Sequence, residues 1–315
     1  MTNPEIDDML ALLNAGFPRV EEMTGAQARA AVAARRQPVT NLDDVASADD
    51  VSIEAAHGQI PARVYRPHGN SADRPVVVFF HGGGFVFCDL DTHDGFCRAM
   101  ARGTDAVVVS VDYRLAPEHR APAAAEDAFA ATRWAIEHAA ELGGDPHRVV
   151  VMGDSAGGNL AAAVCLMARD DGGPMPAAQV LVYPVIDPAC DSESAQRYAT
   201  GYFNTLAATR WYWTQYLPDD GVLPEPTAYV APLTAATLSG LPPAIVVTAG
   251  LDPLCSEGEQ YAAALADAGV PVVHRGYDDL FHGFLTILSM RAAVGPREQL
   301  WGDLAALLER TRVAP

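Results

Sequence analysis

The chain has 315 residues, of which 50% are hydrophobic and 19% are charged, a balance typical of a well-packed globular protein. Acidic residues outnumber basic residues by 40 to 21, which gives a formal net charge of −19 at pH 7. A surface of this charge repels phosphate backbones and anionic membranes, so we expect no nucleic-acid partner. The longest apolar runs have the length of strands and fall well short of the ~20 residues that cross a membrane.

The cysteine and lysine content narrows the chemistry further. Because the chain contains no lysine, a Schiff-base lysine, a P-loop lysine and a Ser-x-x-Lys acylation site are all excluded. The five cysteines are odd in number and scattered, and no pair has the spacing of metal ligands. We therefore expect a reduced, cytoplasmic protein with no metal site and with ordinary thiols at Cys88, Cys97, Cys165, Cys190 and Cys255.

The first 45 residues or so have helical periodicity. Thr24-Gly25-Ala26-Gln27 resembles the start of a helix that runs to Arg36. An earlier helix is expected to bury one stripe, formed by Ile6, Met9, Leu10, Leu12 and Leu13. Since these helices precede every strand, they must pack on structure formed later in the chain, as a lid or flank.

A predicted hairpin over residues 51–66, with its turn at His57-Gly58, opens the sheet. Valine-rich strands and helices then alternate, which is typical of a mostly parallel sheet covered on both faces. The expected strands are 75–80, 106–111, 148–152, 180–185, 244–248 and 270–275. The expected helices are 92–102, 123–142, 256–268, one directly after residue 155, and one within 296–312.

One segment interrupts this alternation. Residues 187–232 contain no obvious strand but many tyrosines and tryptophans. Loops of this length in compact domains are usually functional or carry their own structure. We therefore expect a single α/β domain over residues 1–315, with a helical cap formed by about 1–45 and about 188–225.

The most informative stretch runs from Val149 to Val164. An apolar run stops at Gly153-Asp154-Ser155-Ala156-Gly157-Gly158, and a small-residue helix follows at once. This is the G-x-S-x-G elbow, in which a nucleophilic serine is held on a sharp turn between a strand and a helix. The helix N-terminus there favours developing negative charge.

A nucleophilic serine needs a general base and an acid that orients the base. In hydrolases with this elbow the order along the chain is Ser, acid, His. Only His274 and His282 follow Ser155; His274 lies inside a predicted strand, whereas His282 lies in a loop beyond the end of that strand. We take His282 as the base and Asp252, just after a buried strand, as the acid. The competing acids are Asp187, Asp278 and Asp279.

The oxyanion site is predicted at His81-Gly82-Gly83-Gly84, directly after the strand 75–80. Consecutive glycines expose backbone N–H groups, and the residue after the nucleophile supplies another. We expect Gly83, Gly84 and Ala156 as donors, Gly82 as the turn residue, and His81 as an anchor of the loop. Asp154 is expected to bind nearby backbone or a tyrosine, and Glu118 to pair with Arg114 or with loop amides.

Together these motifs strongly resemble the bacterial hormone-sensitive-lipase-like branch of the α/β-hydrolases. Further matches are Asp112-Tyr113-Arg114-Leu115-Ala116-Pro117-Glu118, Asp252-Pro253-Leu254 and His282-Gly283-Phe284. The resemblance implies the α/β-hydrolase fold and a carboxylesterase for esters with short to medium acyl chains. It also implies no cofactor, a two-part cap and a homodimer. Two departures are Cys88, where many relatives have glycine, and Ser256, where an acid is common.

By this interpretation, Ser155 attacks an ester carbonyl, His282 takes the proton, and an acyl-enzyme is hydrolysed. Phe85, Phe203 and Trp211 are candidate residues of the substrate pocket. An amidase, peptidase or lactonase could use the same triad, since the fold sets acyl transfer and not the leaving group. A non-catalytic small-molecule receptor on the same fold is the alternative from another class. The presence of His282 argues against that alternative.

Overall fold

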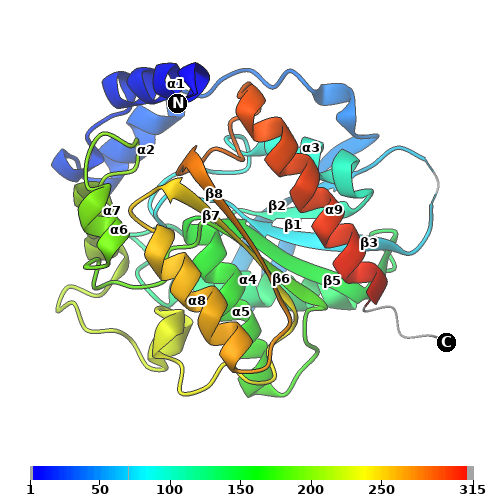
Figure 1. The fold of residues 1–315 in the computed structure, drawn as a ribbon. Coiled ribbons are helices and arrows are strands. Elements are labelled where there is room, and N and C mark those ends of the chain that lie inside the picture. Colours follow the sequence, from blue (N-terminus) through cyan, green and yellow to red (C-terminus); the bar gives the residue numbers. More distant parts are fainter. Residues whose placement is uncertain (1–2, 70, 311–315) are drawn as a thin grey trace.

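A twisted eight-stranded sheet forms the centre of the computed structural model, which describes residues 3–69 and 71–310 (Figure 1). The strand order is β1-β2-β4-β3-β5-β6-β7-β8. β1 pairs antiparallel with β2, and β2 with β4, while all other pairs are parallel. The bounds are β1 Ser47–Ala55, β2 Gly58–Arg66, β3 Arg74–Phe80, β4 Val107–Val111, β5 Gly144–Asp154, β6 Ala178–Val182, β7 Ala244–Leu251 and β8 Val272–Phe281. The predicted hairpin and the predicted parallel sheet are both confirmed.

Helices cover both faces of this sheet (Figure 1). They are α3 (Asp94–Thr104) and α9 (Val294–Arg310) on one face, and α4 (Ala123–Glu137), α5 (Ala156–Asp171) and α8 (Cys255–Asp267) on the other. The central strand β3 is buried along its whole length. Val77 and Phe79 pack in the cluster that includes α3 and α9, whereas Val76, Val78 and Phe80 pack in the cluster that includes α4 and α5. This explains why the strand is a continuous apolar run and not an alternating one.

Several expected boundaries differ from the structure, among them the end of the strand expected over 180–185, which lies at Val182, and the end of the helix expected to run to Arg36, which lies at Ala33; two ends differ by five residues or more. The helix predicted over 123–142 ends at Glu137, where the His138 amide still bonds to the Trp134 carbonyl. The last strand was predicted to end at residue 275 but continues to Phe281, because its polar residues still pair with β7 up to Leu251. Polar residues at an exposed edge strand weaken the sequence signal without breaking the pairing.

The cap helices lie together beyond the carboxyl ends of the parallel strands (Figure 1). They are α1 (Pro4–Gly16), α2 (Gly25–Ala33), α6 (Glu193–Arg197) and α7 (Leu206–Tyr216). The predicted start of α2 is confirmed by a capping box between Thr24 and Gln27. The predicted stripe of α1 is wrong at Leu12, which is 65% exposed, while Ile6 and Leu10 are buried.

None of the helices within residues 3–69 and 71–310 has both the length and the apolar character that crossing a membrane requires.

Candidate active site

Ser155 lies on the turn between β5 and α5, as the elbow motif predicts. Its backbone has φ 56° and ψ −116°, a conformation that costs a non-glycine residue free energy and that surrounding contacts must maintain. The Ser155 amide donates to the Val182 carbonyl of β6 at 2.8 Å. A Cβ on Gly157 would lie 1.8 Å from the Phe80 carbonyl oxygen, so only glycine lets α5 approach β3 this closely.

The structure brings Ser155, Asp252 and His282 together. β7 and β8 pair at Leu251 and Phe281, so the next residue on each strand, Asp252 and His282, leaves the sheet at the same edge. The His282 Nδ1 lies 2.6 Å from Asp252 Oδ2, and its Nε2 lies 2.9 Å from Ser155 Oγ. Asp252 is fully buried, and residues Ser155 and His282 are each 8% exposed. This geometry lets the imidazole take the hydroxyl proton.

The predicted donor loop, residues 82–87, lies beside Ser155 because β3 and β5 are neighbours, with Phe80 opposite Gly153. Gly83 and Gly84 have φ of 119° and 59°, which glycine adopts without strain. Within the described part of the chain, the amides of Gly83, Gly84 and Ala156 have no hydrogen-bond acceptor. They are therefore available to a negatively charged oxygen in the adjoining cavity.

Asp154 connects the elbow to the donor loop. Its Oδ1 accepts a hydrogen bond from the Gly82 amide at 2.8 Å and lies 3.4 Å from His93 Nε2. Burial would raise the pKa of this carboxyl, but the His93 ring and the Gly82 amide hold that pKa below its usual range. Asp154 is therefore an anion under the donor loop, as expected for a residue that binds nearby backbone.

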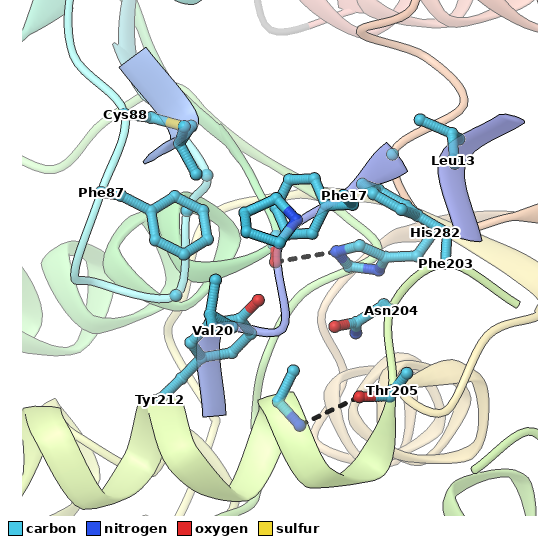
Figure 2. Close-up of a pocket in the computed structure, with 18 of the residues that line it drawn as sticks. Leu13, Phe17, Val20, Phe87, Cys88, Phe203, Asn204, Thr205, Tyr212 and His282 are labelled. Carbon is cyan, nitrogen blue, oxygen red and sulfur yellow. Dashed lines mark hydrogen bonds between the residues drawn. The ribbon is translucent and has the colours of Figure 1, made fainter. Parts of the chain in front are cut away.

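A cavity of about 440 Å³ opens onto Ser155 and His282. Its wall is largely apolar and comes from the cap, the donor loop and the loop after β8 (Figure 2). Figure 2 shows the rings of Phe17, Phe87, Phe203 and Tyr212 around the space next to His282. Phe17 and Phe203 meet edge to face at 5.0 Å between ring centroids, which closes the cavity where the two cap segments meet.

Two of the three predicted pocket residues lie elsewhere. Phe203 lines the cavity, but Phe85 is fully buried and stacks on Tyr216 of α7 at 3.8 Å between centroids. Trp211 does not line the cavity either, because the face of α7 that does so carries Ala208 and Tyr212, four residues apart. Helical spacing from the N-cap Thr205 was the signal that could have identified Tyr212.

The rejected candidates have structural partners of their own. His274 Nε2 lies 2.9 Å from Thr248 Oγ1 inside the sheet, and Asp187 accepts the Ala189 amide at 2.9 Å. The expected pairing of Glu118 with Arg114 is wrong, since Glu118 pairs with Arg29. Arg114 instead pairs with Asp127 of α4, whose side chain is buried and shielded from water.

The two departures from the family pattern have different consequences. Cys88 lines the cavity, and burial raises the pKa of its thiol to about 12, so it stays protonated and poorly reactive at neutral pH. Ser256 exchanges hydrogen bonds with Ser194, with amide-to-hydroxyl distances of 2.9 and 3.2 Å. This exchange joins α8 to the cap helix α6.

Within the described ranges, no three His, Cys, Asp or Glu side chains are arranged to hold a metal ion. The model of a family described as having the α/β-hydrolase fold matches residues 77–286. The chain belongs to the hormone-sensitive-lipase-like α/β-hydrolases.

Relatives in this family are named as ester hydrolases. Carboxylic ester hydrolase LipN of Mycobacterium tuberculosis is 49% identical, over 83% of this chain and 70% of the relative. Carboxylesterase NlhH of the same species is 40% identical over 90% of each chain. The solved structure of a hyperthermophilic esterase from Pyrobaculum calidifontis is 37% identical, with a TM-score of 0.86 over 97% of this chain and 98% of that one.

Proposed function

We propose that this α/β-hydrolase is a serine carboxylesterase that hydrolyses esters with short to medium acyl chains through an acyl-enzyme. Its class, carboxylic ester hydrolase, follows from the family and from relatives that carry that name. The single observation that carries the proposal is the chain of hydrogen bonds from Asp252 through His282 to Ser155, which ends at the cavity.

In the proposed first step, Ser155 Oγ attacks the ester carbonyl while His282 Nε2 takes its proton. Asp252 holds the imidazole in the tautomer that leaves Nε2 free to accept, and stabilises the imidazolium that forms. The negative oxygen of the tetrahedral intermediate accepts hydrogen bonds from the amides of Gly83, Gly84 and Ala156. Each such donor contributes about 3 kcal/mol to transition-state stabilisation in enzymes of this type.

The intermediate then collapses and the alcohol leaves with the proton from His282. Water takes the place of the alcohol, gives a proton to His282 and attacks the acyl carbon, which releases the acid and restores Ser155. Every proton in both halves of the cycle passes through the same imidazole nitrogen. No cofactor enters the reaction.

The cavity favours an uncharged acyl group. Its wall is mostly apolar, and Arg19, the one arginine lining it among the residues that the structure describes, is already paired with Glu21 and Glu22. The lining carboxylate of Asp154 adds negative charge near Ser155. An acyl chain that ends in a carboxylate would lose its hydration there without a cation to pair with.

The test is hydrolysis of 4-nitrophenyl butyrate by the wild type and by Ser155→Ala. Loss of the nucleophile should lower kcat by about 10⁴-fold or more. A serine-directed phosphonate should add mass to the peptide that contains Ser155 in the wild type only. Turnover by Ser155→Ala at the wild-type rate would refute the assignment, and binding of the phosphonate without any ester turnover would favour the receptor.

Amide and lactone substrates of matched acyl length are the second arm of this experiment. We expect a higher kcat/KM for the butyryl ester than for the amide or the lactone. A higher kcat/KM for the amide or the lactone would reassign the leaving group while keeping the triad.

A further inference from the structure

The donor loop has a strained backbone, although the Val86 and Phe87 amides both donate to the Gly83 carbonyl inside it, at 3.0 and 3.1 Å. Three consecutive residues, Gly83, Gly84 and Phe85, have positive φ values of 119°, 59° and 64°. The first two are glycines, but Phe85 has a Cβ and pays for the left-handed conformation. Such a conformation persists only where contacts from outside the loop maintain it.

Hydrogen bonds from the body of the enzyme hold the loop at two points, and the Phe85 ring also stacks on Tyr216 of α7. At its start, the Gly82 amide donates to Asp154. In its middle, the Phe85 carbonyl accepts the Ala116 amide at 2.9 Å. Asp154 and Ala116 both lie outside the N-terminal cap.

A third hydrogen-bonded attachment comes from the N-terminal part of the cap. Arg29 of α2 uses one nitrogen, Nη1, to donate to the Val86 carbonyl at 2.8 Å and to the Ala116 carbonyl at 2.9 Å. Its other terminal nitrogen donates to Glu118. A single guanidinium therefore binds the donor loop and the segment that holds the middle of that loop.

Helix α2 is also in direct contact with these two segments. A Cβ on Gly25 would lie 2.5 Å from Pro117 Cδ and 3.5 Å from Val86 Cγ1. Glycine at the start of α2 thus allows the helix to approach closely enough for the Arg29 side chain to reach both carbonyls. The Arg29 side chain is 26% exposed, and its bonds to the Val86 and Ala116 carbonyls are partly buried, so water competes weakly for them.

The same N-terminal segment also forms part of the cavity wall, through Leu13, Phe17, Val20 and Val32. We infer that Arg29 is a positioning residue, which makes the geometry of the oxyanion donors depend on the docking of helix α2. The cap then contributes to the rate of the reaction as well as to substrate binding. This inference deepens the proposed esterase function and rests on it.

The test is Arg29→Gln, which removes the charge and the fork of donors from α2. Because hydrogen bonds from a charged donor are stronger than those between neutral groups, their loss should lower kcat for 4-nitrophenyl butyrate by about 10- to 100-fold. We expect KM to stay within about threefold, since no Arg29 atom lines the cavity. Arg29→Lys keeps the charge but not the fork, and should lose less activity than Arg29→Gln.

A second readout reports on the oxyanion site itself. A butyl trifluoromethyl ketone adds reversibly to Ser155: Oγ bonds to the carbonyl carbon, His282 takes the hydroxyl proton, and the electron pair of the C=O π bond moves to the oxygen, which becomes negative at the donor amides. Its inhibition constant should rise by the factor by which kcat/KM falls. A role confined to stability would change the melting temperature and leave this constant unaltered.

Arg36→Gln is the matched control. Arg36 follows α2 and joins the same cap segment to the body through Asp89 and Asp91, at 2.6 Å each, with no bond to the donor loop. Glu118→Gln removes only the exposed ion pair of Arg29. Both variants should keep kcat and the inhibition constant within about twofold of the wild type.

An equal loss in Arg36→Gln and Arg29→Gln, or a raised KM with unchanged kcat in Arg29→Gln, would overturn the inference. If Arg29→Gln does not fold, Arg29→Lys is judged by the same two readouts. An unaffected Arg29 variant alongside an inactive Ser155→Ala would refute only the role of Arg29. A wild type without ester turnover would refute the proposed function itself.

Discussion

His81 is fully buried under the donor loop, where its ring stacks on Tyr113 at 4.4 Å between centroids. Its Nδ1 lies 2.7 Å from the Gly82 carbonyl oxygen and donates to it. Burial, together with the nearby His93, lowers the pKa of this imidazole to about 4. The ring is therefore neutral in the folded protein at pH values where an exposed histidine is charged.

The free energy of unfolding should depend on pH through this group. As the pH falls below about 6.5, the unfolded chain binds a proton at His81 before the folded protein does, so stability decreases. The stabilisation by His81 is thus present above pH 6.5 and lost as the pH falls towards 4, with about 2 kcal/mol lost between pH 7 and pH 5. The variant His81→Asn keeps a side-chain N–H but does not titrate. Its free energy of unfolding, measured with urea, should therefore lack this decrease between pH 7 and pH 5.

Asp112→Asn provides a control of opposite sign. Burial, Asp89 and Asp91 raise the pKa of the Asp112 carboxyl to about 6. The stabilisation of the folded protein by the protonated Asp112 carboxyl is present below pH 4 and is lost as the pH rises through 6. The free energy of unfolding of Asp112→Asn should therefore increase relative to that of the wild type as the pH rises. Unfolding curves for His81→Asn and the wild type that stay parallel from pH 7 to pH 5 would contradict the assignment to His81.

The elbow depends on close contact between β3, β5 and α5, and this contact requires glycine at two positions of the motif. β3, β5 and α5 meet at Gly153 and Gly157, where a Cβ on either residue would lie within 2.2 Å of backbone atoms. A substitution at such a position forces a strand and a helix apart, and with them the donor loop and Ser155. The small residues of this motif are therefore a packing requirement as well as a conformational one.

Gly157→Ala should lower the free energy of unfolding by about 3 kcal/mol or more, because the added methyl group meets the Phe80 carbonyl. Gly302 in α9 is the matched control: a Cβ there meets nothing within 4 Å. Gly302→Ala should stabilise the protein by up to about 1 kcal/mol through helix propensity. Urea unfolding measures both, and similar stability of the two variants would contradict the packing argument.

Across the whole molecule, the cavity is completed by segments almost two hundred residues apart. Asn14 of α1 donates through Nδ2 to the Gly201 carbonyl at 2.7 Å and accepts the Phe203 amide at 3.0 Å. These two bonds hold the N-terminal segment against the loop before α7, where Phe17 contacts Phe203. The substrate pocket therefore needs both parts of the predicted cap.

Asn14→Ala should raise KM for 4-nitrophenyl butyrate by about 3- to 10-fold with little change in kcat, because it loosens the wall and not the reacting groups. Leu12→Ala, at an exposed position of the same helix, should leave both constants unchanged. Steady-state kinetics measure these effects. A fall in kcat for Asn14→Ala at constant KM would show that this contact serves the chemistry and not the pocket.

The homodimer and the cytoplasmic location expected from the sequence stay predictions.

Local signals were enough for the central features of this protein. Apolar runs predicted the strands, Thr24 and Gln27 predicted the start of α2, and the elbow and the glycine run predicted where Ser155 and the donor loop would lie. These features depend on steric limits and periodicities within a few residues, so they can be read from short stretches. The chain order Ser, Asp, His then selected Asp252 and His282, which meet because their strands are neighbours.

The surroundings of the site depend on contacts between distant segments. Of the expected pocket residues Phe85, Phe203 and Trp211, Phe203 lines the cavity and the other two do not. Phe87 and Tyr212 line it instead. Which ring faces the cavity is set by the rotation of α7 against the donor loop, and Glu118 pairs with Arg29 because α2 docks beside it. A local pattern gives the spacing of side chains along one element, whereas their partners are chosen when the elements pack against each other.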